Sequence, residues 1–145
     1  LGDVYKRQLL YSKRLSHYTD FELQEIPSLK ISTKISQSEL KKSEGQMVMK
    51  YLNSSDYVVL LDENGKSYSS IDFSKKIEKF MLNSFKRVVF VIGGAFGFSD
   101  ELYSCCNEKL SLSNMTFSHQ MVRLFFVEQL YRAFTIINNE KYHHQ

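Results

Sequence analysis

The stretch VVFVIGGAFGFSDEL, residues Val88 to Leu102, decides the fold class. It begins as a continuous apolar run, which is typical of a strand covered on both faces of a sheet. Three glycines in the pattern GGxxG follow, and Ser99 is then a good N-cap for a helix. This order predicts either a turn that holds a ligand against bare backbone or a tight connection that holds none.

The spacing of the glycines argues against a nucleotide phosphate. Gly93, Gly94 and Gly97 form neither GxGxxG nor a loop that ends in GK[ST]. Asp100 and Glu101 fall in the first turn of the predicted helix, where they suit its partial positive charge. A pyrophosphate there would meet two negative charges with no lysine to compensate, so the pattern favours a ligand without phosphates.

The flanking segments extend the alternation of strands and helices. Continuous apolar runs predict buried strands at Tyr57–Asp62 and Arg87–Ile92, and ENGK (63–66) predicts a turn between the first strand and the next helix. FELQEI (21–26), closed by Pro27, alternates apolar and polar residues and predicts a further strand. Together these segments predict an α/β fold with a mainly parallel sheet and helices on both faces.

Helices are predicted between and after these strands. The segment 35–53 reads as a solvated outer helix with Gly45 as a weak point, and Ser69 or Ser70 caps a helix through about Leu82. That second helix is expected to bury Ile71, Ile77, Phe80 and Met81. A short helix from Ser99, the segment KLSLS (109–113) and a long helix over about 118–137 complete the pattern.

Length and composition restrict the class of protein. With 145 residues and 43% hydrophobic content, the chain fits one domain with a real core. A net charge of +3 is compatible with an RNA partner without requiring one. No window approaches a membrane span. The adjacent Cys105 and Cys106 make neither a probable disulfide nor a zinc site, which favours reduced thiols in a cytosolic protein without a bound metal.

The first eight residues, LGDVYKRQ, are expected to be foreign to the fold. DVYKRQ back-translates to a sequence that resembles a transposon-end adapter. Residues 1–8 are therefore predicted to be adapter-derived, and residues 9–145 to form a single domain that lacks its first strand.

The stretch 110–137 is the most unusual part of the chain. The loop SNMTFS (113–118) offers hydrogen-bonding side chains and free backbone groups, and it leads into a helix that is apolar on most sides. Such a helix predicts a second subunit against one surface. Its expected apolar face holds Val122, Phe126, Leu130, Ala133 and Ile137.

Charged pairs on this helix are spaced four residues apart. His119 and Arg123 adjoin the loop, which favours a role at a site, whereas Glu128 and Arg132 are interpreted as an ion pair. The end, NNEKYHHQ (138–145), taken alone predicts a solvated tail.

Four segments carry a resemblance to a known family: LLDENGKSYSSIDF, VFVIGGAFGF, LSLSNMTFSHQMVRLFFVEQLYRAF and KYHHQ. Together they resemble the bacterial 23S ribosomal RNA pseudouridine N3-methyltransferases, the small single-domain type of the SPOUT class. The resemblance covers about Tyr11 to Gln145. It implies an α/β fold with a C-terminal trefoil knot, a homodimer, and the large ribosomal subunit as substrate.

The resemblance also implies S-adenosylmethionine as the methyl donor. The implied cofactor residues are Leu61, Gly94, Ser113, Asn114, Met115, Thr116, Phe117 and Ser118. Position and residue type make His119 the candidate base for the proton that leaves N3, with Arg123 supporting the RNA or the developing anion. The candidates for the partner-subunit side of the pocket are Arg132, Tyr142 and His143.

Three departures from the family pattern leave an alternative open. The family usually has proline where Ser118 stands, a basic residue follows the Tyr-His pair of its tail, and it begins with a strand that is absent here. The alternative is an inactive RNA- or ribosome-associated module of the same fold, which would retain a vestigial pocket.

Overall fold

The computed structural model describes residues 2–27 and 35–144, and these group into two compact units. The first unit contains the described residues up to Leu23, Ser67–Ser84, and those from Met115 onward. The second contains the described residues of Gln24–Lys66 together with Phe85–Asn114. Leu1 of the predicted adapter segment and Gln145 of the predicted tail lie outside the described residues.

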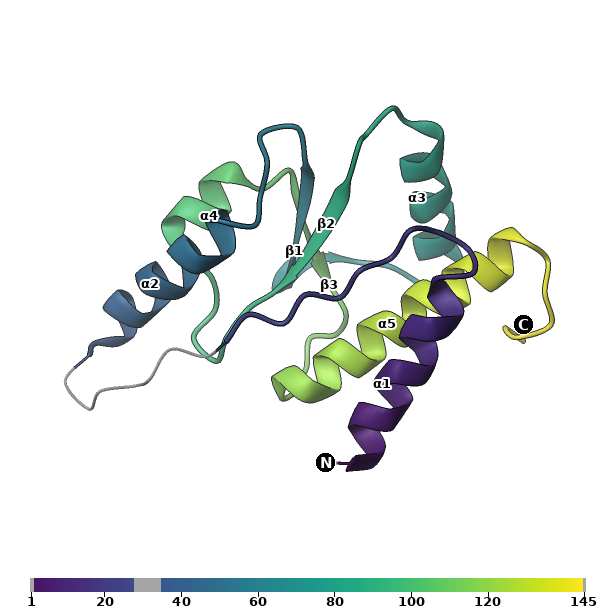
Figure 1. Ribbon diagram of the computed structural model, residues 1–145, viewed down its shortest axis with the longest axis horizontal. Helices are drawn as coiled ribbons and strands as arrows, with labels where there is room; N and C mark the ends of the chain where they lie inside the picture. The colour runs from purple at the N-terminus through teal and green to yellow at the C-terminus, as the bar shows by residue number, and fades with distance from the viewer. Residues whose placement is uncertain (1, 28–34, 145) are drawn as a thin grey trace. The chain divides into compact units, whose positions relative to one another are not determined.

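The second unit is built on a three-stranded sheet (Figure 1). Its strand order is β2-β1-β3, with β1 at Tyr57–Ser67, β2 at Val88–Ile92 and β3 at Glu108–Ser111. β1 and β2 run parallel, in a register from Tyr57 opposite Val88 to Leu61 opposite Ile92. This confirms the parallel pairing predicted for the two apolar runs.

Two helices pack against this sheet, α2 at Gln37–Met49 and α4 at Asp100–Cys105. The core combines Val58, Leu60 and Val91 of the strands with Phe98 and Leu102. Val59, which points to the opposite face of β1, is also fully buried. β1 is therefore covered on both faces, as predicted, whereas only one of the five residues of β2 is buried.

The first unit is a group of helices in which α1 (Gly2–Leu15) and α3 (Ser70–Leu82) both pack against α5 (His119–Ile137). The Ser69 hydroxyl accepts a hydrogen bond from the Asp72 backbone N–H, which confirms the predicted cap of α3. On the predicted apolar face of α5, three residues are buried and Val122 and Ile137 are half-buried. None of the helices among the described residues is both long and apolar enough to span a bilayer.

Three predictions about local structure are wrong. Residues 21–26 belong to no strand and are mostly exposed, since alternation stabilises a strand only where a neighbour pairs with it. ENGK (63–66) is not a separate turn, because β1 continues to Ser67. Met81 is 55% exposed, and the buried aromatic residue of α3 is instead Phe73, whose ring lies 6.2 Å from that of Phe126.

The segment predicted to be foreign to the fold is helical from Gly2 onward, and Gln8 is buried. Its origin as an adapter remains a prediction.

Gly45 is the point at which α2 meets α4, rather than a weak point on a solvated helix. The glycine is buried, and a Cβ placed on it would lie 2.2 Å from the Ser99 hydroxyl oxygen. That hydroxyl accepts a hydrogen bond from the Leu102 backbone N–H, 3.3 Å away, and so caps α4. The missing side chain therefore permits direct contact between α2 and the beginning of α4.

We expect Gly45→Ala to destabilise the protein even though alanine is the better helix former. In an open helix this change stabilises by up to about 1 kcal/mol, but the added methyl group must displace the cap of α4, which costs about 1–3 kcal/mol. The midpoint of urea unfolding should therefore fall. Gln46→Ala, at the exposed neighbouring position, is the matched control, and an equal response of both variants would contradict the contact.

Candidate cofactor and catalytic site

The glycine turn connects β2 to α4 and is closed by its own backbone. The Gly97 N–H donates to the Gly94 carbonyl at 3.2 Å, and Gly97 has φ +84°, a left-handed conformation that favours glycine. The ring of Phe98 lies over Gly93, where a Cβ would come within 2.8 Å of it. Ser99 then begins α4, as predicted, with two acidic residues in the first turn.

Gly94 faces a carboxylate from another element. A Cβ built on Gly94 would lie 2.6 Å from Glu44 Oε2 and 3.2 Å from Oε1. Glu44 belongs to α2 and immediately precedes Gly45. Sequence reasoning missed Glu44, although a glycine inside an otherwise strong helix was a signal of close contact with a neighbouring element.

The register of the sheet brings two predicted cofactor residues to the same end of the paired part of β1 and β2. Leu61 is half-buried and pairs with Ile92, which directly precedes the glycine turn. Leu61 and Gly94 therefore lie near one another in the second unit. Ser113 and Asn114 follow β3 in the same unit, and the Ser113 carbonyl accepts a hydrogen bond from the Ser111 hydroxyl at 3.0 Å.

The rest of the predicted cofactor loop belongs to the first unit and is exposed: Met115, Thr116, Phe117 and Ser118. Ser118 occupies the N-cap position of α5 without making a side-chain cap. The ring of Phe117 packs edge-to-face against Phe125, 5.3 Å away.

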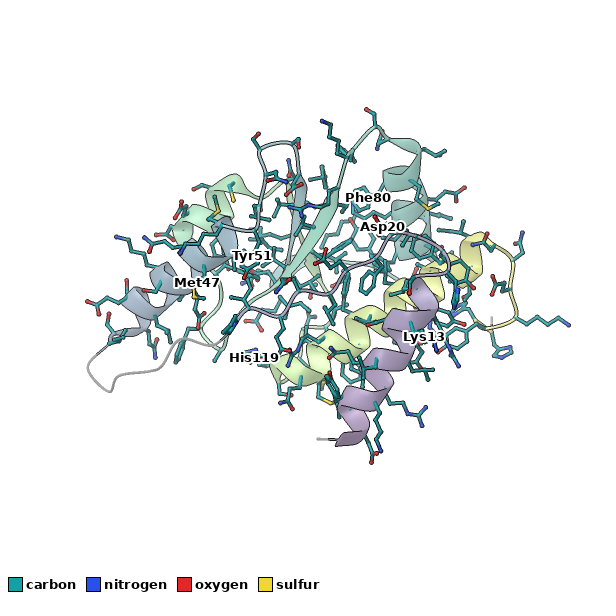
Figure 2. All side chains as sticks on the ribbon, viewed as in Figure 1. Lys13, Asp20, Met47, Tyr51, Phe80 and His119 are labelled. Carbon is teal, nitrogen blue, oxygen red and sulfur yellow. The ribbon has the colours of Figure 1, made fainter. Side chains whose placement is uncertain are left out.

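The two predicted catalytic residues at the beginning of α5 lie one turn apart. Figure 2 shows His119 at the first residue of the helix, where it is exposed. Arg123 follows four residues later and is half-buried. His119 is therefore accessible to a substrate.

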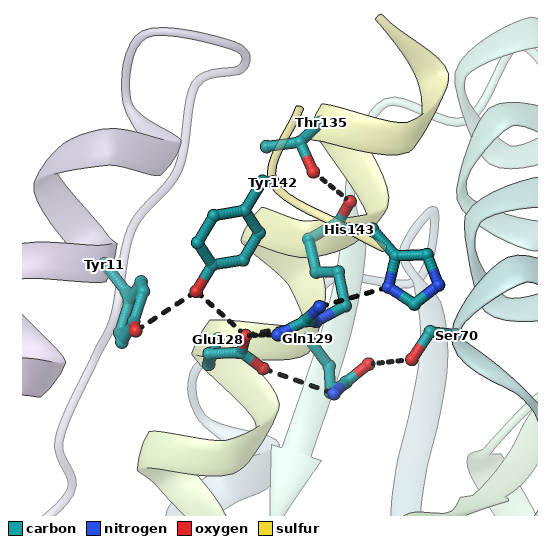
Figure 3. Close-up of polar contacts among 8 residues, drawn as sticks. Tyr11, Ser70, Glu128, Gln129, Thr135, Tyr142 and His143 are labelled. Carbon is teal, nitrogen blue, oxygen red and sulfur yellow. Dashed lines mark hydrogen bonds and ion pairs between the residues drawn. The ribbon is translucent and has the colours of Figure 1, made fainter. Parts of the chain in front are cut away.

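The other three predicted catalytic residues form a cluster near the opposite end of α5 (Figure 3). The Arg132 guanidinium donates through Nε and Nη2 to Glu128 Oε1, at 3.1 and 2.6 Å, which confirms the predicted ion pair. The Tyr142 hydroxyl donates to the same oxygen at 3.0 Å, and it lies 3.2 Å from the Tyr11 hydroxyl. Burial, together with these two contacts, raises the pKa of Tyr142.

The geometry also fixes the tautomer of His143. Its Nδ1 lies 3.0 Å from Arg132 Nη1, and because a guanidinium can only donate, Nδ1 must accept. His143 in this arrangement carries its ring proton on Nε2. Tyr142 and His143 thus attach the chain end to α5, and the prediction of a solvated tail is wrong for these residues.

A second contact holds the segment after α5. The Tyr18 hydroxyl donates to the Glu140 carboxylate at 2.6 Å, and the Tyr18 ring stacks on Phe134. The hydrogen bond to Glu140 raises the pKa of Tyr18 to about 12. Sequence reasoning missed Tyr11, Tyr18 and Glu140, because their contacts join segments that are far apart in the chain.

Comparison with known proteins identifies the family of the chain. Residues 4–143 match the family model described as "Predicted SPOUT methyltransferase". The chain belongs to the SPOUT methyltransferase family. This confirms the resemblance and, with it, the prediction of a methyltransferase.

Three similar proteins are each called "Ribosomal RNA large subunit methyltransferase H". The protein from Christiangramia forsetii is 52% identical over 150 residues, which cover 100% of this chain and 96% of the relative. Those from Parabacteroides distasonis and Flavobacterium johnsoniae are 52% and 53% identical over 135 residues, which cover 93% of this chain and 86% of each relative.

The residues around the glycine turn fit the methyl donor of such an enzyme. S-adenosylmethionine carries a sulfonium and no phosphate, so it does not conflict with the acidic first turn of α4. The bare backbone at Gly94 permits close approach, and Glu44 adds a negative charge beside it. Among residues 2–27 and 35–144, no group of three or more His, Cys, Asp or Glu side chains could hold a metal ion.

We expect Glu128→Gln to release the chain end from α5. The substitution removes the charge that pairs with Arg132 and weakens the hydrogen bond from Tyr142, a loss of about 1.4 kcal/mol. Trypsin should then cleave after the exposed Lys141 about tenfold faster, as mass spectrometry of the C-terminal peptide would measure. Glu78→Gln, on the exposed side of α3, should leave the rate unchanged; equal rates in both variants would argue against the anchoring role.

Proposed function

We propose that the protein transfers a methyl group from S-adenosylmethionine to N3 of a pseudouridine in 23S rRNA of the large ribosomal subunit. The observation that carries this proposal is 52% identity, over the whole chain, to a relative named as a large-subunit rRNA methyltransferase. Membership of the SPOUT methyltransferase family supports the reaction class. The proposal includes the C-terminal trefoil knot of the family and a cytoplasmic site of action.

The proposed cofactor site consists of Leu61, Gly94 and the loop Ser113–Ser118. When bound there, the cofactor supplies an electrophilic methyl carbon on sulfur. Transfer to nitrogen is an in-line displacement, so the protein accelerates it mainly by positioning the acceptor nitrogen. The backbone at Gly94 and the loop position the methyl donor for this displacement, and no phosphate has to be neutralised.

The acceptor N3 carries a proton that must leave. His119 is the proposed base, since its imidazole is exposed at the first turn of α5 and imidazole is the side chain that most often serves as a general base. Arg123, one turn further along, is proposed to stabilise the negative charge that develops on the imide, or to hold the RNA.

The separation of the two predicted catalytic groups supports a homodimer. His119 and Arg132 are 13 positions apart on one helix, which corresponds to roughly 20 Å along its axis. The two groups of one chain therefore cannot act on the same atom. A second copy can bring its own Arg132, Tyr142 and His143 to the His119 of the first.

The exposed aromatic residues at the beginning of α5 are the proposed contact between copies. Phe117 and Phe125 pack edge to face with 37% of each exposed, and Met115 is 73% exposed. We expect Phe125→Glu to shift the protein from dimer to monomer in sedimentation velocity. Leu82→Glu, at an 82% exposed position of α3, is the control; a dimer that persists in Phe125→Glu would contradict this surface.

Two measurements test the enzymatic function. Calorimetry should detect binding of S-adenosylmethionine, and the protein should methylate ribosomes that lack the modification. Donor binding without methylation of either ribosomes or free rRNA would instead favour the alternative of an inactive RNA-associated module. The uncapped Ser118 at the beginning of α5 is the observation that keeps this alternative open.

We expect His119→Ala to lower the single-turnover rate about 10²–10⁴-fold, the range that general base catalysis supplies. His17→Ala, at an exposed position outside the site, is the control. An unchanged rate at every pH would exclude His119 as the base.

A further inference from the structure

Glu44 is positioned to contact whatever occupies the glycine turn. Both of its carboxylate oxygens face Gly94, as the 2.6 and 3.2 Å approaches to a built Cβ show. The contact of Gly45 with Ser99 fixes the same part of α2, so the carboxylate is held there by the packing of two helices. All of these residues belong to the second unit.

The Glu44 carboxylate has no partner among the described residues. It makes no hydrogen bond or ion pair with residues 2–27 or 35–144, although its side chain is half-buried beside the turn. Partial removal of a carboxylate from water is unfavourable unless a cation or donor compensates. A charged group kept in this position therefore points to a ligand that carries positive charge.

The proposed reaction changes the charge of the bound molecule at this site. S-adenosylmethionine carries a sulfonium, an ammonium and a carboxylate, a net charge of about +1 at neutral pH. Loss of the methyl group as a cation equivalent leaves S-adenosylhomocysteine, a neutral thioether with no net charge. A fixed negative charge beside the turn attracts the first molecule more strongly than the second.

We propose that Glu44 is a specificity-determining residue that makes the site prefer the cationic methyl donor to its uncharged product. This inference rests on the proposed function. Because Glu44 attracts the cationic donor, the bound molecule loses this attraction once the methyl group has been transferred. The neighbouring acidic residues of α4, Asp100 and Glu101, have the same sign and reinforce the preference.

Calorimetric titration with three ligands tests this role. Wild type and Glu44→Gln would each be titrated with S-adenosylmethionine, S-adenosylhomocysteine and sinefungin, which replaces the methyl sulfonium by an aminated carbon and is also cationic. We expect Glu44→Gln to weaken binding of both cationic ligands about tenfold and of the product less than about twofold. Glu39→Gln, an exposed glutamate of the same helix, should change none of the three affinities.

Each other outcome has a distinct meaning. An equal loss for all three ligands would mean that Glu44 contacts the shared ribose or amino acid portion, and it would overturn the charge preference, as would no loss at all. Failure of the wild type to bind any ligand would overturn the proposed function and this inference with it. Glu44→Asp retains the charge and serves if Glu44→Gln does not fold; its affinity ratio of donor to product should then remain above one.

Discussion

The geometry of the glycine turn depends on how closely α2 can approach the beginning of α4. Gly45 sets that distance, because any larger residue would collide with the Ser99 hydroxyl that caps α4. The same contact places Glu44, one residue earlier, against Gly94. One close contact, that of Gly45 with Ser99, therefore determines both how α2 packs on α4 and where the Glu44 carboxylate lies. A glycine inside a helix permits this contact despite its conformational cost.

In the first unit, α5 has a comparable role because it carries functional groups at both ends. Its first turn presents an exposed His119, whereas its last turns hold Arg132 in contacts to Glu128, His143 and the ring of Tyr142. The Arg132 charge is already compensated by Glu128, so its main effect within one chain is to position the tail. A catalytic or RNA-binding role for this cluster would have to use its remaining exposed surface.

Sequence reasoning succeeded where local patterns determine structure. The apolar runs of β1 and β2, the caps at Ser69 and Ser99, and the i,i+4 pair of Glu128 and Arg132 all depend on neighbours in the chain. It failed where the structure of a segment depends on contact with a residue far away in the chain. Gly65 was interpreted as part of a turn, but its Cβ position lies 2.6 Å from the Leu110 backbone nitrogen, so glycine is needed there for close approach of backbones.

The same limit applies to the candidate site. Four motifs in order identified the family and the glycine turn, yet Glu44 lies about fifty residues before Gly94 and belongs to no motif. Only the folded chain shows that the carboxylate and the turn meet. The first turn of α4 and Glu44 both place negative charge next to the glycine turn, which contains no lysine. Such a field opposes a pyrophosphate and favours a cation, and this argument for the proposed cofactor does not depend on the family's name.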